Sequence, residues 1–129
     1  MSSLHSLDFL TVEDLLEIAA GILGEASVRD RGLLASAAAR PATTVFGSDA
    51  YPTFAEKAVA LMHSLARNHA LVDGNKRLAW SATRAFCLLN GHDVHSTVDD
   101  AEQLVLAAAA GTCDVPDIAA WIDGHLVGA

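Results

Sequence analysis

The sequence of 129 residues is poor in cysteine, proline, aromatic side chains and basic residues. Its two cysteines, Cys87 and Cys113, are too few for a disulfide framework and lack metal-site spacing. We interpret them as free thiols of a reducing cytosol, with Cys87 in the core. Only 3 prolines beside 52% hydrophobic residues exclude a disordered chain and favour one domain over residues 1–129.

Long apolar runs and an export signal are also missing. No stretch approaches about 18 uninterrupted apolar residues, which a membrane-spanning helix needs. The first ten residues, MSSLHSLDFL, have neither a basic region nor a long apolar region. We therefore expect a cytoplasmic protein that does not enter a membrane.

Basic residues are scarce, since 8 Lys and Arg stand against 16 Asp and Glu, for a net charge of -8. This acidity disfavours direct binding to nucleic acid or to anionic lipid. Four basic residues nevertheless cluster in residues 67–84, namely Arg67, Lys76, Arg77 and Arg84. An anionic ligand would therefore be bound locally, although Arg84 fits a solvated helix face equally well.

Helical patterns occupy most of the chain. Thr11 and Thr53 each precede an acid by three residues, as in a capping box, and the helices that follow should end near Gly24 and Asn68. Asp114 is the expected N-cap of the last helix. Further helices are predicted over residues 30–40, 75–90, 98–111 and 114–126.

Strand patterns of period two are not found, and only a very short extended piece is expected around Val94. Pro41 ends the helix before it, and residues 42–52 are predicted to form a loop. The fold class is therefore all-α, a compact bundle of about six helices. The helix that follows residues 69–74 is expected to be central and buried.

The segment HALVDGNKR, residues 69–77, joins two of these helices. Backbone N–H groups near Gly74, Asn75 and Lys76 should be the unpaired donors of a helix N-terminus, which attracts anions. Gly74 would let the backbone approach a ligand, and Lys76 and Arg77 add positive charge. The segment predicts a phosphate site of a different kind from a P-loop.

Asp73 and His69 each have two interpretations. A carboxylate beside a phosphate site can hold a bridging Mg²⁺, but Asp73 could also be the N-cap of the next helix, and the two roles are compatible. His69 could take a proton from an attacking hydroxyl or could cap the preceding helix. We interpret His63, inside that helix, as structural.

This segment resembles the Doc (death-on-curing) motif of the Fic/Doc superfamily, H-x-F-x-[D/N]-[A/G]-N-K-R. The matching residues are His69, Asp73, Gly74, Asn75, Lys76 and Arg77. Leu71 replaces the motif's Phe and should still anchor the loop in the core. The likeness extends more loosely from about Thr11 to Trp121, and the family's helical core agrees with the all-α expectation.

The resemblance implies a role for each matching position. His69 would be the general base that activates a target hydroxyl, and Asp73 the Mg²⁺ ligand. The phosphates of ATP would be bound by Gly74, Asn75, Lys76, Arg77 and Arg67.

Lys76 distinguishes two activities within the superfamily. Fic-type AMP transferases have Gly there and place the α-phosphate in line with the target hydroxyl, whereas Doc-type proteins bind ATP inverted and transfer the γ-phosphoryl group. Lys76 therefore favours a protein Ser/Thr kinase over an AMP transferase. Leu71 leaves open a catalytically silent nucleotide-binding module, while the net acidity and single carboxylate disfavour a nuclease.

The resemblance also implies partners. The chain would be the toxin of a type II toxin–antitoxin system that phosphorylates a threonine of elongation factor Tu and arrests translation. Its cognate antitoxin would be Phd-like and would place a C-terminal segment in a groove near the site. The loop Thr43–Pro52 is the candidate segment for guiding the target chain.

Overall fold

A computed structural model describes residues 6–129 of the chain, and this part contains six α-helices. The helices are α1 (Val12–Leu23), α2 (Arg31–Ala39), α3 (Phe54–Arg67), α4 (Asn75–Leu89), α5 (Val98–Ala110) and α6 (Val115–His125). A short 3₁₀ helix, Arg40–Ala42, extends α2. The predicted all-α bundle is confirmed, with two small strand pairs added to it.

Side-chain caps define where several helices begin. The Thr11 hydroxyl accepts a hydrogen bond from the Asp14 N–H, and the Asp14 carboxylate accepts one from the Thr11 N–H, so this capping box is complete. At α3 the Thr53 hydroxyl accepts from the Glu56 N–H, which is only the first half of a box. Asp114 precedes α6 as predicted, but its side chain makes no capping bond.

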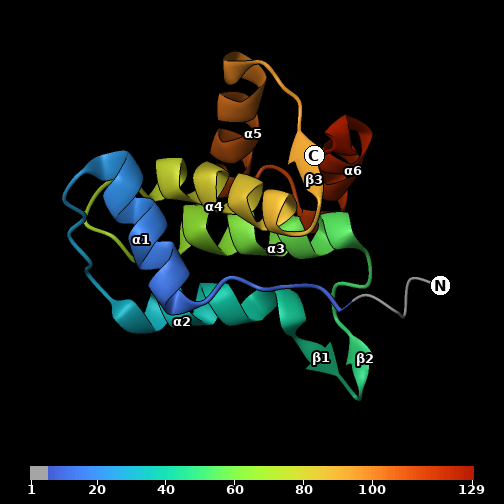
Figure 1. The fold of residues 1–129 in the computed structure, drawn as a ribbon, viewed down its shortest axis with the longest axis horizontal. Helices are drawn as coiled ribbons and strands as arrows, with labels where there is room; N and C mark the ends of the chain where they lie inside the picture. Colours follow the sequence, from blue (N-terminus) through green and yellow to red (C-terminus); the bar gives the residue numbers. More distant parts are fainter. Residues whose placement is uncertain (1–5) are drawn as a thin grey trace.

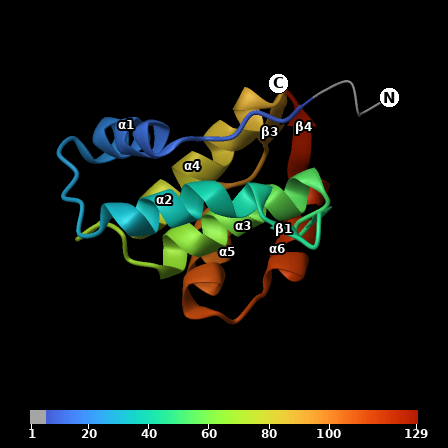
Figure 2. The ribbon, with the colours of Figure 1, turned by 90° about the horizontal axis from the view of Figure 1, so that it is seen from below.

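Helix α3 is at the centre of the molecule. It packs against α2, α4, α5 and α6 and is buried along most of its length (Figures 1 and 2). Helix α4 also buries one side, including Leu78 and Phe86, but Lys76, Arg77 and Arg84 are exposed on it. The most buried helix is therefore the one before residues 69–74, whereas the sequence predicted the one after them.

Two antiparallel strand pairs complete the fold. Strand β1 (Thr44–Val45) pairs with β2 (Ser48–Asp49), inside the segment predicted as a loop. Strand β3 (His92–Val94) pairs with β4 (Leu126–Gly128), so Leu126 belongs to a strand and does not continue the last helix as predicted. Strands of two or three residues are too short to show a period in the sequence.

The connections at the two ends of α3 lie far apart. The chain enters α3 from the β1–β2 hairpin and leaves it through residues 68–74, which we call the motif loop. Both ribbon views place the hairpin at one end of α3 and the motif loop at the other (Figures 1 and 2).

None of the helices in residues 6–129 has both the length and the apolar character needed to cross a bilayer.

Candidate functional site

The N-terminus of α4 presents unpaired backbone donors. Gly74 is the N-cap residue and gives no side-chain cap, and the helical hydrogen bond from the Leu78 N–H ends on the Gly74 carbonyl, at 2.9 Å. The N–H groups of Asn75, Lys76 and Arg77 therefore have no acceptor within the helix. Together with the helix dipole they form a site suited to a phosphate group.

Gly74 is required here for two reasons. Its φ of +85° lies in the left-handed region, which side chains other than glycine rarely adopt. A Cβ atom at this position would also lie 2.7 Å from the Leu23 methyl groups at the end of α1. The sequence suggested close approach to a ligand, and the structure adds close packing against α1.

Asp73 is exposed beside these donors. Its Oδ1 accepts a hydrogen bond of 2.9 Å from the Gly74 N–H, which leaves Oδ2 available for a cation. The N-cap of α4 is Gly74, so Asp73 does not have that alternative role. Residues 6–129 contain no cluster of three or more His, Cys, Asp or Glu side chains for a metal. One carboxylate still fits Mg²⁺, because this ion commonly binds one or two carboxylates together with substrate phosphates.

The Asn75 side chain fixes the motif loop from within. Its Oδ1 accepts from the Leu71 N–H at 2.9 Å, and its Nδ2 donates to the Leu71 carbonyl at 3.0 Å. Leu71 itself is buried, as predicted for the residue in the position of the motif's Phe. The amide of Asn75 is thus used within the loop, so only its backbone N–H faces a ligand.

His69 lies just beyond the end of α3 and is exposed. Asn68 is the C-cap of α3, so the interpretation of His69 as that cap is wrong. The backbone φ of His69 is +53°, an uncommon value for a residue with a side chain. Its carbonyl accepts a hydrogen bond of 2.7 Å from Nε of Arg29.

The connection between α1 and α2 supports the motif loop from outside. The N–H groups of Arg29 and Asp30 both donate to the Ala70 carbonyl, and the Val72 N–H donates to the Ser27 carbonyl. Val28 and Leu71 form an isolated antiparallel bridge. Sequence analysis missed this segment, because no local pattern shows that residues 27–30 and 69–72 are neighbours.

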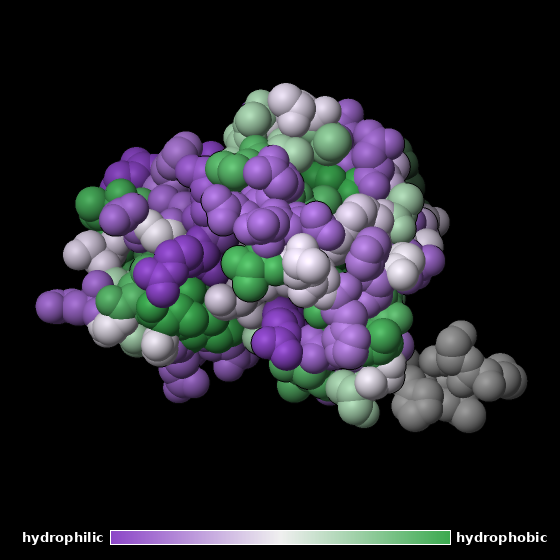
Figure 3. Space-filling model, turned by 90° about the horizontal axis from the view of Figure 1, so that it is seen from above, coloured by the Kyte–Doolittle hydropathy of each residue, from purple (hydrophilic) through white to green (hydrophobic). Residues whose placement is uncertain are grey.

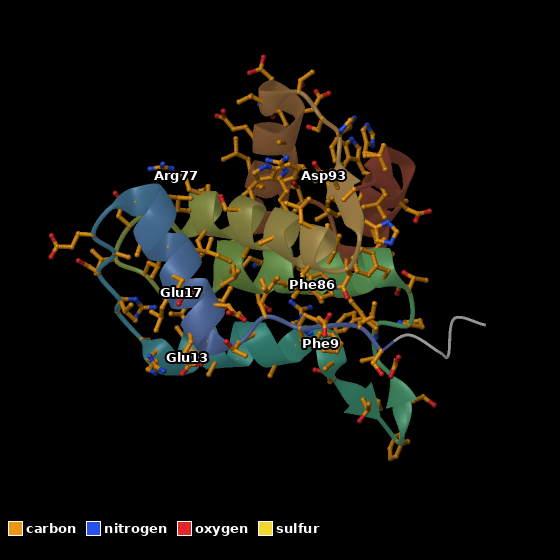
Figure 4. All side chains as sticks on the ribbon, in the orientation of Figure 1. Phe9, Glu13, Glu17, Arg77, Phe86 and Asp93 are labelled. Atoms are coloured by element: carbon orange, nitrogen blue, oxygen red, sulfur yellow. The ribbon has the colours of Figure 1, made fainter. Side chains whose placement is uncertain are left out.

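Two of the four clustered cations lie at this site. Lys76 is exposed in the first turn of α4. The Nη2 atom of Arg77 donates to the Ile22 carbonyl at 2.7 Å, and Figure 4 shows Arg77 beside the end of α1. Arg77 therefore reinforces the packing of α1 against the first turn of α4, and its remaining donors can reach a ligand.

The other two cations have partners of their own. Arg67 packs its guanidinium against Gly111 at the end of α5. Arg84 forms a paired contact with Asp93, at 2.8 and 3.0 Å. This guanidinium lowers the pKa of Asp93 to about 2.

His63 and Cys87 lie away from the site. Nδ1 of His63 lies 2.9 Å from Nη1 of Arg40, and burial followed by the charges of Arg40 and Arg67 lowers the pKa of His63. Cys87 is buried as predicted, and burial raises the pKa of its thiol to about 12. Cys113 is also a free thiol and is partly exposed.

A groove of about 500 Å³ begins at Lys76 and Arg77 and runs between α4 and α5. Its lining residues are Ile22, Lys76, Arg77, Trp80, Ser81, Val98, Ala101, Glu102, Val105 and Leu106. Figure 3 shows the molecule from the side of α5, where hydrophobic residues gather in patches among polar ones. The groove can take an apolar ligand group or a protein segment next to the phosphate site.

The hairpin is remote from this arrangement. Residues 43–52 lie at the other end of α3 from the motif loop (Figure 1). Their position does not support the expectation that they guide a target chain. Lys57 fixes the hairpin to α3 by bonding the Asp49 carboxylate, at 3.1 Å, and the Tyr51 carbonyl.

Comparisons with known proteins agree with this geometry. The family model described as Fic/DOC family matches residues 9–87, which include all of the motif loop. The curated protein Toxin Doc of Mycolicibacterium smegmatis (strain ATCC 700084 / mc(2)155) is 50% identical over 127 residues, which cover 95% of this chain and 96% of that protein. The chain belongs to the Fic/DOC family.

Proposed function

We propose that this chain is the toxin of a toxin–antitoxin pair and acts as a protein kinase. In this proposal it transfers the γ-phosphoryl group of ATP to a threonine hydroxyl of elongation factor Tu and thereby arrests translation. The likeness to Toxin Doc supports the toxin role. The observation on which the kinase role depends is Lys76 in the first turn of α4, next to unpaired N–H donors and an exposed carboxylate.

In this proposal each of these groups has one chemical role. His69 takes the proton of the threonine hydroxyl as its oxygen attacks the γ-phosphorus, and the bond between that phosphorus and the β,γ-bridging oxygen breaks to release ADP. The N–H groups of α4, Lys76 and Arg77 stabilise the negative charge on the phosphate oxygens. Asp73 would hold Mg²⁺, which neutralises phosphate charge when bound.

Lys76 is the residue that separates the kinase from an AMP transferase. A lysine side chain in the first turn of α4 occupies space that the glycine of AMP-transferring relatives leaves open. Its ammonium group is also well placed to bind phosphate oxygens at the helix end. Both effects favour a nucleotide bound with its γ-phosphate toward the base.

Labelled ATP tests this proposal directly. The protein is incubated with elongation factor Tu and Mg²⁺, and with ATP labelled at either the α- or the γ-phosphate. We expect label on the factor only from the γ position. Label from the α position would replace the kinase with an AMP transferase, and nucleotide binding without any transfer would indicate a silent binding module.

A pair of histidine variants identifies the base. His69→Ala should reduce γ-phosphoryl transfer by about 100-fold or more, as loss of a general base does. The matched control is His95→Ala, which removes another exposed imidazole. Both variants should keep the helical circular dichroism of the parent, and full activity of His69→Ala would remove His69 from this role.

The groove between α4 and α5 supports the second part of the proposal, an antitoxin. Val98 and Leu106 expose apolar surface there, with Lys76 and Arg77 at one end. We infer that a C-terminal antitoxin segment binds here, close enough to obstruct the nucleotide. Leu106→Asp should weaken antitoxin binding in calorimetry without changing phosphoryl transfer, and unchanged binding would exclude this groove.

A further inference from the structure

We propose that Arg29 is a positioning residue for the base: its guanidinium holds the His69 peptide group in the left-handed conformation from which the imidazole acts. This inference rests on the proposed function only in taking His69 as the base. Arg29 lies outside the motif loop, in the connection between α1 and α2. Its side chain nevertheless reaches the backbone of the histidine.

The conformation of His69 needs support from its surroundings. A residue with a side chain at φ +53° is less stable by roughly 1–2 kcal/mol than in the ordinary helical region. Such a conformation persists only where neighbouring groups fix it, and it recurs at functional sites. Residue 69 has a Cβ atom, so the left-handed conformation costs free energy that a glycine would not lose.

Arg29 provides the fixing contacts. Its Nε donates to the His69 carbonyl at 2.7 Å, and its Nη2 donates to the Asn68 carbonyl at 3.3 Å. Asn68 is the C-cap of α3 and His69 follows it, so both carbonyls lie at the C-terminal end of the helix, where the helix dipole favours a cation. Within residues 6–129 the guanidinium forms no ion pair with a carboxylate, so these carbonyls are its protein partners.

The other contacts of the motif loop do not hold the backbone of His69. The N–H groups of residues 29 and 30 bind the Ala70 carbonyl, and Asn75 binds Leu71. In the described part of the chain, the tertiary hydrogen bond to the His69 backbone comes from the Arg29 side chain. Removing that side chain should therefore release residue 69 while residues 70–75 stay in place.

The decisive variant is Arg29→Met, which keeps the apolar stem and removes both hydrogen bonds. The matched control is Arg31→Met, two residues later, where the guanidinium pairs with Glu13 at 3.0 Å on the exposed surface. Steady-state transfer to elongation factor Tu gives kcat and the KM for ATP. The amide-to-Hα NOE within His69, which is strong only at positive φ, reports the backbone independently of activity.

For Arg29→Met we expect a kcat lower by about 10- to 100-fold, the scale of a misplaced catalytic group, with the KM for ATP within about twofold of the parent. The His69 NOE should weaken, and Arg31→Met should change neither quantity. An Arg29→Met protein that keeps a strong NOE, or loses it with kcat unchanged, overturns the proposal. Equal losses of kcat and ATP affinity would also overturn it, because they indicate a general structural role.

Arg29→Lys covers the case in which the methionine variant does not fold. An ammonium group can reach one of the two carbonyls but lacks the fork, so the NOE should weaken and kcat should fall without being lost. A weakened NOE with the parent's kcat would overturn the proposal. If the parent itself transfers no label, the proposed function fails, and the NOE comparison still decides whether Arg29 holds His69.

Discussion

The two connections at the ends of α3 contain the same unusual backbone feature for different reasons. In the hairpin, Phe46 and Gly47 have φ of +51° and +80°, and in the motif loop His69 and Gly74 have φ of +53° and +85°. The hairpin residues are adjacent and form a two-residue turn, in which both central residues take positive φ. The backbone conformation of the hairpin is therefore determined by adjacent residues.

The motif loop is not such a turn, although His69 directly follows the C-cap of α3, where positive φ is common. Its two residues at positive φ are separated in sequence, and contacts from elsewhere hold them: Arg29 on His69 and Leu23 against Gly74. Phe46, by contrast, is fully exposed at the hairpin tip, at 104%. The backbone of His69 is therefore held by a segment distant in sequence, whereas that of Phe46 is held by its neighbours and turns the chain.

The largest effect is expected from Asn75→Ala. This change leaves the buried N–H and carbonyl of Leu71 without partners and should cost about 3 kcal/mol of unfolding free energy, with loss of phosphoryl transfer. The control is Asn90→Ala, which removes amide bonds to Phe86 and Asp8. Urea unfolding and transfer assays should show that both lose stability and only Asn75→Ala inactivates the folded protein.

A pair of glycine variants compares the two loops directly. In Gly74→Ala the new Cβ atom is strained by the positive φ and also clashes with the Leu23 methyl groups. The change should lower the free energy of unfolding by about 2 kcal/mol. Gly47 has a similarly positive φ, but a Cβ atom there would have no other atom within 4 Å. Gly47→Ala should therefore lower the free energy of unfolding by only about 1 kcal/mol. If thermal unfolding shows equal losses of stability in the two variants, Leu23 at the end of α1 moves away from residue 74 at no cost.

Lys57→Met tests whether the hairpin matters for the target. It removes the bonds to Asp49 and Tyr51 and should cost about 1 kcal/mol, because methionine still fills the buried space. Limited proteolysis should then cleave near Phe46 more readily. Transfer to elongation factor Tu should be unchanged, and a selective loss of transfer would show that the hairpin guides the target after all.

Asparagine substitutions at the two strained residues should have the smallest effects on stability. Phe46→Asn loses no packing and creates an Asn-Gly turn, so it should stabilise the fold by about 0.5–1 kcal/mol. His69→Asn should be close to neutral in calorimetry and inactive in transfer. A strongly destabilised His69→Asn would indicate that the imidazole itself contributes to packing.

Local patterns predicted the helices and their order well. The Thr11 capping box and the glycines that end α1 and α5 are short-range signals, and each helix begins or ends there as expected. The short extended piece expected around Val94 is strand β3, but its partner β4 and the β1–β2 pair were not predicted, because pairs such as Val94 with Leu126 join distant residues through a few hydrogen bonds. Asp114 shows the limit of a cap pattern, since its side chain makes no capping bond.

The candidate site was predictable in composition and only partly in geometry. Gly74, Lys76 and Arg77 lie together at a helix end because they are consecutive or nearly so. The contact from Arg77 to Ile22, and the contacts of Arg29, depend on how α1 and its connection to α2 pack on the motif loop. No periodicity within either segment encodes that packing.

The bonding between residues 27–30 and 69–72 also affects exchange of amide hydrogens with solvent. Although the motif loop exposes side chains, the amides of Arg29, Asp30, Leu71 and Val72 are all donors in hydrogen bonds that close it. Their deuterium uptake should be as slow as that of helix interiors rather than that of a mobile loop. His69, Asp73 and the first N–H groups of α4 would then open and close as one cooperative unit with the connection between α1 and α2.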